Sequence, residues 1–229
     1  GSEMCIRDSL TTHRPVAAYL ARTANAKVLS VDYRMAPENR FPAAEDDAVA
    51  WWKELLAQGI NPSDVVFAGD SAGGGLTLAC LLAARQQGLP LPAGALLFSP
   101  WTDLTCSGET MRTMAEVDVM FNPESLPEAA TFYVDAKDLK NPLASPLFGD
   151  MTGMPEMLIF ASNHEILLSD SIRLHDKLKQ QGVRSELIRR DKLPHVWPTM
   201  LMLPEARKDL KISGDFITRV TRAALAKAA

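Results

Sequence analysis

The feature that most constrains the fold is a Gly-Asp-Ser-Ala-Gly turn at residues 69–73. An apolar stretch at 65–68 precedes this turn and predicts a strand, and residues 73–87 follow it with a helical pattern that ends at Gly88. A serine on a sharp strand-to-helix turn has a strained backbone, and glycines two residues to either side would avoid side-chain collisions there. The pattern therefore predicts that Ser71 is lifted above the edge of a sheet.

The rest of the chain alternates apolar, strand-like runs with helical patterns. This alternation is typical of an α/β protein with a mostly parallel sheet and helices on both faces. The predicted strands are residues 27–33, 65–68, 93–99, 157–161 and 185–189, and the predicted helices are residues 43–58, 73–87, 169–181 and about 204 to near the end. Residues 101 to about 150 interrupt the alternation. We expect short helices over the sheet edge there, with most of their Met, Phe and Tyr side chains in core packing.

Composition excludes several classes of protein. The 229 residues suffice for one domain, and a net charge of −4 argues against a nucleic-acid-binding surface. No apolar run is long enough to span a membrane. The three cysteines are far apart and odd in number, which argues against a disulfide framework and is compatible with a reducing compartment. We therefore expect a cytoplasmic protein.

A serine hydroxyl is a weak nucleophile and needs a general base. Four histidines are available. His13 precedes the first predicted strand, His175 lies within a predicted helix beside basic residues, and His164 suits a supporting role. His195 lies in the loop between the last strand and the last helix, downstream of Ser71, as the chain order serine, acid, histidine requires. We therefore predict His195 as the base.

The acid that orients the base should lie between the fourth predicted strand and the catalytic histidine. Asp170 and Asp176 fall in a predicted helix, where a solvated or helix-start role is expected, and Asp191 suits a turn cap. Asn163 is neutral and would stabilise an imidazolium poorly. Glu165 follows the strand by four residues and is the predicted acid, and the alternative for this residue is a charge at a helix N-terminus.

Several motifs together resemble the hormone-sensitive lipase family of bacterial carboxylesterases. Residues 32–38 (DYRMAPE) resemble the family's D-Y-R-L-A-P-E, and residues 69–74 resemble G-D-S-A-G-G. Residues 99–104 (SPWTDL), 142–146 (PLASP) and 195–197 (HVW) also match, and the resemblance covers about residues 9–200.

The resemblance implies an α/β-hydrolase fold with an eight-stranded, mostly parallel sheet and a cap over the site. It also implies hydrolysis of short-chain acyl esters with no metal and no cofactor. In the family the acid opens a D-P-L-R-D stretch, and Glu165 opens the corresponding stretch here, residues 165–169 (EILLS).

One family element is missing from the printed sequence. The family carries an H-G-G-G run whose glycine amides complete an oxyanion hole, and residues 9–14 (SLTTHR) resemble the end of that region. The run would then fall at residues 1–5, which read GSEMC. We therefore expect residues 1–9 to be a stretch foreign to the family. Residues 10–229 would then form a single, partial catalytic domain that lacks the N-terminal strands and the cap.

The predicted chemistry is acyl transfer by a triad of Ser71, His195 and Glu165, with the Ala72 amide as an oxyanion donor. The expected partner is a small ester, with no metal or cofactor, and a homodimer is left open. The rival hypotheses are an impaired fragment or a small-molecule-binding protein on this fold. Plant gibberellin receptors resemble the family and have lost the catalytic histidine, whereas His195 is present here. A peptidase or a lactonase is the alternative among enzymes, because a fold alone does not determine the substrate.

Overall fold

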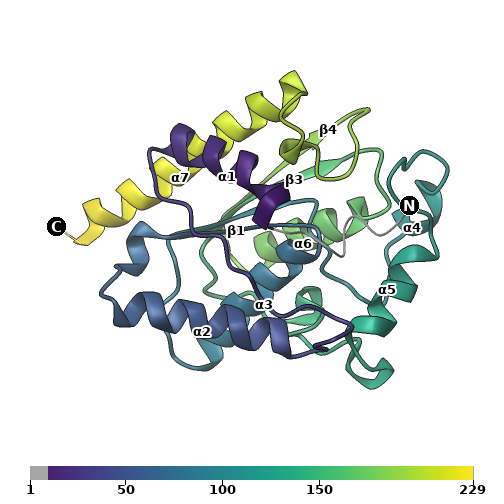
Figure 1. The fold of residues 1–229 in the computed structure, drawn as a ribbon, viewed down its shortest axis with the longest axis horizontal. Helices are drawn as coiled ribbons and strands as arrows, with labels where there is room; N and C mark the ends of the chain where they lie inside the picture. Colours follow the sequence, from purple (N-terminus) through teal and green to yellow (C-terminus); the bar gives the residue numbers. More distant parts are fainter. Residues whose placement is uncertain (1–9, 229) are drawn as a thin grey trace.

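A computed structural model describes residues 10–228, so the predicted N-terminal stretch 1–9 lies outside the described residues. The described residues form a four-stranded parallel sheet in the order β1-β2-β3-β4 (Figure 1). The strands are β1 (Val66–Asp70), β2 (Gly94–Phe98), β3 (Glu156–Ser162) and β4 (Ser185–Arg190). Four of the five predicted strands are therefore confirmed, with ends close to those predicted.

Helices cover both faces of this sheet. The five longer ones are α1 (Leu10–Ala24), α2 (Ala43–Ala57), α3 (Ala72–Gln86), α6 (Leu168–Gln180) and α7 (Pro204–Ala228). Short helices occupy the region predicted to interrupt the alternation, namely α4 (Thr110–Thr113), α5 (Ser125–Tyr133), and 3₁₀ turns at Ala136–Asp138 and Pro146–Phe148. Two further 3₁₀ turns lie at Pro62–Asp64 and Trp197–Thr199.

The two faces of the sheet have separate cores because successive side chains of a strand point to opposite sides. Leu97 and Ile159 pack against α3 and α6 on one face, whereas Leu96 and Phe160 pack against α1 and α7 on the other. Figure 1 shows α1 and α7 lying along one side of the strands and α3 and α6 on the opposite side. The fifth longer helix, α2, packs mainly on α3, and its Trp52 ring contacts Phe67 of β1 edge to face.

The predicted strand at residues 27–33 is wrong. This segment has no strand structure, and the side chains of Val28 and Leu29 are about half exposed. An extended segment becomes a strand only when a neighbour accepts and donates its backbone hydrogen bonds. Within the described residues, β1 pairs with β2 alone and no strand pairs with the 27–33 segment. The family resemblance implied a sheet of eight strands, whereas the sheet within residues 10–228 has four.

Helix α1 was not predicted from the sequence. Its side chains Val16 and Leu20 are spaced four residues apart and are buried against α7, with Tyr19 packed beside them. Such spacing defines one helix face, and Pro15 within the helix weakens the signal. In the part of the chain that is described, no helix meets the length and apolarity needed to cross a bilayer.

Candidate active site

The four parallel strands end at one edge of the sheet, where the loops that follow them meet. Ser71 follows β1, Ser99 follows β2, Glu165 lies three residues beyond β3, and His195 lies in the loop after β4. Because parallel strands place their carboxyl ends together, residues from four distant parts of the sequence converge there. This edge holds the predicted site residues.

Ser71 occupies the predicted strained turn between β1 and α3. Its φ of 51° and ψ of −121° lie in a region that side-chain-bearing residues rarely adopt. Its amide donates to the Phe98 carbonyl at 2.9 Å, and its carbonyl accepts from the Trp101 amide at 2.9 Å. The end of β2 therefore holds the turn in place, and the Ser71 side chain is nearly buried.

The glycines of the turn have different reasons to be glycine. A Cβ on Gly69 would lie 2.2 Å from the Gly73 carbonyl oxygen, and one on Gly75 would lie 2.3 Å from the Trp101 carbonyl oxygen. Both distances are far below contact, so these two positions require glycine. At Gly73 a Cβ would meet nothing within 4 Å, so the predicted collision is wrong on that side of Ser71.

The structure brings together the three side chains predicted from the sequence. His195 Nε2 lies 2.9 Å from Ser71 Oγ, and His195 Nδ1 lies 2.8 Å from Glu165 Oε2. His195 and Glu165 are fully buried. The carboxylate beside Nδ1 favours the tautomer with its proton on Nδ1, which leaves Nε2 to accept the Ser71 hydroxyl proton. Glu165 Oε1 accepts from the Ser162 amide at 3.2 Å, which orients the carboxylate from the end of β3.

The loop that carries His195 is held by strained backbone and by buried polar groups. Val196 has a φ of 50°, an uncommon conformation for a β-branched residue, and its amide donates to Ser99 Oγ at 3.2 Å. The next residue, Trp197, donates from Nε1 to the buried carboxylate of Asp209 at 3.0 Å. Helix α7 and the loop after β2 therefore hold the histidine loop from opposite sides.

Phe121 is a site residue that the sequence analysis did not single out. Its ring contacts the imidazole of His195 edge to face, with ring centroids 4.9 Å apart. It belongs to the segment between α4 and α5, which the sequence predicted only as short helices with core-packing side chains. No local pattern links it to a histidine 74 positions later, so only the tertiary structure reveals this contact.

The other histidines take no part in the Ser71–His195–Glu165 chain of contacts. His13, rejected as the base because of its place in the chain order, lies with its Nε2 3.1 Å from Oδ1 of Asp70, the residue before the serine. His164 Nδ1 accepts from the Lys192 amide at 3.0 Å, and His175 Nδ1 lies 2.9 Å from Ser185 Oγ. These contacts agree with the supporting role expected of His164, and they show His175 to be half-buried rather than free in solvent.

The carboxylate on His195 Nδ1 is that of Glu165, and the rejected acid candidates have other surroundings. The side-chain NH₂ of Asn163 donates to Asp191 Oδ1. The side-chain oxygen of Asn163 accepts from Arg189 Nε at 2.6 Å. Asp176 is exposed on α6. Asp191 and Asn163 thus tie the loop after β3 to the loop after β4.

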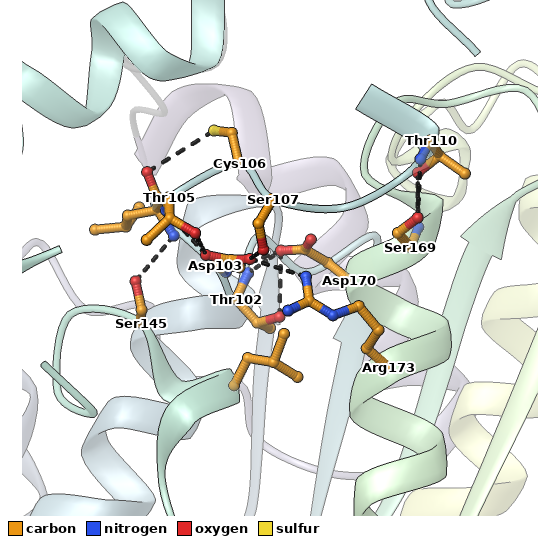
Figure 2. Close-up of polar contacts among 12 residues, drawn as sticks. Thr102, Asp103, Thr105, Cys106, Ser107, Thr110, Ser145, Ser169, Asp170 and Arg173 are labelled. Carbon is orange, nitrogen blue, oxygen red and sulfur yellow. Dashed lines mark hydrogen bonds and ion pairs between the residues drawn. The ribbon is translucent and has the colours of Figure 1, made fainter. Parts of the chain in front are cut away.

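Asp170 lies in the first turn of α6, as the helix-start alternative expected, but it is buried rather than solvated. It is 2% exposed, and its Oδ2 accepts from the amides of Thr102 and Asp103 at 2.7 and 2.9 Å. Figure 2 shows these groups, with Arg173, between the loop after β2 and the first turns of α6. Burial raises the pKa of Asp170 to about 7, with the nearby Asp103 charge adding to the effect. The acidic group is buried because backbone amides of a distant loop satisfy it.

Asp103 titrates in the opposite direction. Burial by itself would raise the pKa of its carboxyl. Hydrogen bonds from Ser107 Oγ at 2.6 Å, Thr105 Oγ1 at 2.5 Å and Arg173 Nη1 at 2.8 Å outweigh burial and hold the pKa below its usual value. Below pH 7 the two neighbouring carboxyls therefore differ in charge, which limits their mutual repulsion.

The backbone amides at the start of α3 bear on the predicted oxyanion donor. The amides of Gly74 and Gly75 donate to the Ser71 carbonyl at 3.0 and 3.3 Å. Ala72 precedes them in the first turn, where helix amides have no carbonyl partner in their own helix. The Ala72 amide is also the one bonded to the nucleophile residue itself. No H-G-G-G run occurs in the printed sequence to add glycine amides to it.

A cavity of about 340 Å³ opens at Ser71. Its lining is largely apolar and includes Ala72, Trp101, Leu104, Phe121, Leu126 and Phe132. Residues 33–37 form part of the wall, and Arg34 holds this segment to α2 by an ion pair with Asp47 at 2.7 Å. The cavity has room for a small, mainly apolar molecule with one reacting group beside Ser71.

Glu45 is a buried acid in the wall of the cavity. Its Oε1 accepts a hydrogen bond from the Tyr133 hydroxyl, whereas its Oε2 has no hydrogen-bond partner among the described residues. Burial raises the pKa of Glu45. In the sequence, Glu45 lies in the acidic first turn of the predicted helix 43–58. No group of three or more His, Cys, Asp or Glu residues within the described part of the chain is arranged to hold a metal ion.

Comparison with known proteins identifies the family. The sequence profile of the alpha/beta hydrolase fold family matches residues 4–199. The chain belongs to the α/β-hydrolase family.

Similar members of the α/β-hydrolase family include an acetyl-hydrolase of Streptomyces hygroscopicus, which is 39% identical over 211 residues. That match spans 92% of this chain and 71% of the relative. A crystal structure of an esterase from the bacterial hormone-sensitive lipase family superposes with a TM-score of 0.92 at 40% identity. The superposition covers 96% of this chain and 74% of that esterase.

The solved structure of EstE5 soaked with p-nitrophenyl butyrate is also similar to this α/β-hydrolase. It has a TM-score of 0.91 and 41% identity, and the match covers 97% of this chain and 74% of EstE5. Together these matches group the chain with the hormone-sensitive-lipase-like esterases, as the sequence motifs predicted.

Proposed function

We propose that this α/β-hydrolase hydrolyses short-chain acyl esters through a covalent acyl-enzyme, with Ser71, His195 and Glu165 as its catalytic triad. The observation that carries the proposal is the pair of contacts at His195, 2.9 Å to Ser71 and 2.8 Å to Glu165, within a buried site. A protein that only binds a ligand has little use for a nucleophile, a base and an acid that are linked by hydrogen bonds.

In the first half-reaction His195 Nε2 takes the hydroxyl proton as Ser71 Oγ attacks the ester carbonyl carbon. The Ala72 amide donates to the oxyanion that develops, and the dipole of α3 favours the same charge. The bond to the leaving alkoxide then breaks, and His195 gives the proton to that oxygen. This step releases the alcohol and leaves the acyl group on Ser71.

In the second half-reaction His195 removes a proton from water, which attacks the acyl carbonyl. The tetrahedral intermediate collapses, the carboxylic acid leaves, and His195 returns the proton to Ser71 Oγ. Glu165 keeps the imidazole in the required tautomer and stabilises its protonated form in both halves.

The choice of substrate rests on the cavity and on the relatives. A volume of about 340 Å³ with apolar walls suits a short acyl chain rather than a long one. The relative at 39% identity is named an acetyl-hydrolase, and EstE5, at 41% identity, was soaked with p-nitrophenyl butyrate. Acetyl and butyryl esters are therefore the first substrates to test.

The test measures hydrolysis of p-nitrophenyl esters from acetate to decanoate by the chain and its variants. Ser71→Ala and His195→Ala should abolish turnover, and activity should fall as the acyl chain lengthens. Ser171→Ala and His175→Ala are the matched controls, because Ser171 is buried without a hydrogen bond and His175 lies on α6. Activity that survives Ser71→Ala, or binding of the ester without turnover by the unaltered chain, would contradict the proposal.

A further inference from the structure

Asp118 lies in the turn between α4 and α5, and its carboxylate joins two separate parts of the chain. Its Oδ2 accepts from the amide of Ile166 at 2.8 Å, across 48 residues of sequence. Its Oδ1 accepts from the amides of Met120 and Phe121 at 2.8 and 3.1 Å. One half-buried side chain therefore holds three backbone amides.

Both ends of this bridge reach the triad. Ile166 is the residue after Glu165, so the hydrogen bond from its amide limits the movement of the backbone that carries the acid. Phe121 packs its ring against His195 with centroids 4.9 Å apart. Asp118 itself is not among the residues that line the cavity. It holds the backbone next to the acid Glu165 through the Ile166 amide, and it holds the ring neighbour of the base His195 through the Phe121 amide.

The carbonyl of Ile166 is held by the same segment of the chain. Thr110 Oγ1 donates to this carbonyl at 2.7 Å and lies 2.9 Å from Ser169 Oγ, and Figure 2 shows Thr110 facing Ser169. Ile166 is 1% exposed, so water is not available as an alternative partner for either backbone group. Residues 110–121 thus hold both backbone polar groups of Ile166, the residue that follows the acid.

We propose that Asp118 is a positioning residue for the triad, setting the Glu165 carboxylate and the His195 ring relative to each other. This inference rests on the triad of the proposed function. Both oxygens of Asp118 act as acceptors, so an amide in its place must turn an NH₂ group toward at least one backbone N–H. Asp118→Asn therefore breaks the bridge on one side while keeping its size and shape.

The kinetic test compares Asp118→Asn and Thr110→Val with Asp150→Asn as the matched control. Asp150 also caps a turn, accepting from the Thr152 amide at 3.0 Å, but it is exposed and its ion-pair partner is Arg85 of α3. In the two site variants kcat should fall on the order of 10²-fold with KM nearly unchanged, since misplacement of catalytic groups acts on the chemical step. The pH profile of kcat/KM in the site variants should differ from that of the control, because the geometry of the Glu165–His195 pair changes.

Two readouts do not depend on turnover. Hydrogen exchange at the Ile166 amide should accelerate in Asp118→Asn, and the low-field proton resonance of His195 Nδ1 should shift or broaden. The control should change neither, and thermal unfolding shows whether each variant is folded. If exchange, resonance and pH profile of Asp118→Asn all match the control, the inference is wrong. If activity instead survives Ser71→Ala, the proposed function is what fails, and the exchange and resonance data still decide the role of Asp118.

Discussion

The Nε2 atom of His195 lies 2.9 Å from Oγ of Ser71, although 124 residues separate them in the chain. The contact depends on two loops that follow parallel strands at opposite edges of the sheet, β1 and β4. Each loop contains a residue in a left-handed conformation, Ser71 with φ 51° and Val196 with φ 50°. Strain of this kind persists only where surrounding contacts over-determine the geometry, so the following predictions address the contacts as well as the triad.

Replacing Glu165 by Gln should lower kcat by about 10⁴-fold with little effect on KM, because an amide cannot stabilise the imidazolium and favours the wrong tautomer. Steady-state kinetics with p-nitrophenyl acetate measures the effect. Glu156→Gln is the control, since this carboxylate lies at the opposite end of β3 and pairs with Arg219 at 2.7 Å. Equal activity in the two variants would exclude Glu165 as the acid.

Replacing Gly69 by Ala should lower the free energy of unfolding by about 3 kcal/mol or more, because the new methyl group would lie 2.2 Å from a backbone oxygen. Gly73→Ala should be neutral or stabilising by up to about 1 kcal/mol, since it adds a better helix former in open space. Urea denaturation of both variants measures this difference. Similar losses at both positions would contradict the asymmetry of the turn.

The buried carboxyl of Asp170 should make stability depend on pH. Its native pKa of about 7 lies above the ordinary value for aspartate of about 3.9, so the native state holds an extra proton between these values. The free energy of unfolding contributed by this group therefore falls as pH rises from about 4 to about 7, and levels off above.

Thermal unfolding of the chain and of Asp170→Asn across pH 4–8 tests this dependence. The Tm difference, wild type minus variant, should decline through that window because the amide does not titrate. Asp176→Asn, at an exposed position of the same helix, should show no such trend. A Tm difference for Asp170→Asn that does not vary with pH would refute the prediction.

Replacing Asp209 by Ala should destabilise the fold by about 1–3 kcal/mol, because it leaves the buried indole N–H of Trp197 without an acceptor. It also removes a partner of Arg190, whose Nη2 lies 2.6 Å from Asp209 Oδ1. Urea denaturation measures the loss, with the exposed Asp215 of α7 as the site for a control substitution. Hydrolysis should fall in parallel, because Trp197 anchors the loop of His195. An unfolding free energy equal to that of Asp215→Ala would show that this anchor is unimportant.

Local sequence patterns carried most of the fold prediction. Apolar runs and helical periodicity located β1 to β4 and the helices α2, α3, α6 and α7, because those elements bury a face whose spacing is visible in the sequence. The same reasoning failed at residues 27–33, because an apolar alternating run looks alike whether or not another strand pairs with it. Strand pairing is a non-local property, and the described residues supply no partner for that segment.

Burial of polar groups was the other property that the sequence did not reveal. Asp170 and Glu45 read as ordinary charges near helix starts, yet both are buried. Asp170 is satisfied by amides of a loop 67 and 68 residues earlier in the chain, and Glu45 contacts a tyrosine 88 residues later. Neither partner has a fixed spacing from the acid, so no motif could identify the pair.

The sequence by itself determined the strand-to-helix turn at Ser71, the order serine, acid, histidine and the family, because these follow from local spacing and from motifs along the chain. Only the tertiary structure decided which groups support the site: Phe121 against His195, Asp118 on the peptide after Glu165, and the carbonyl of Gly73 that forbids a side chain at Gly69. The physical reason is that hydrogen bonds and ring contacts act over a few ångströms in space. Such distances between residues far apart in the chain exist only after the sheet has formed.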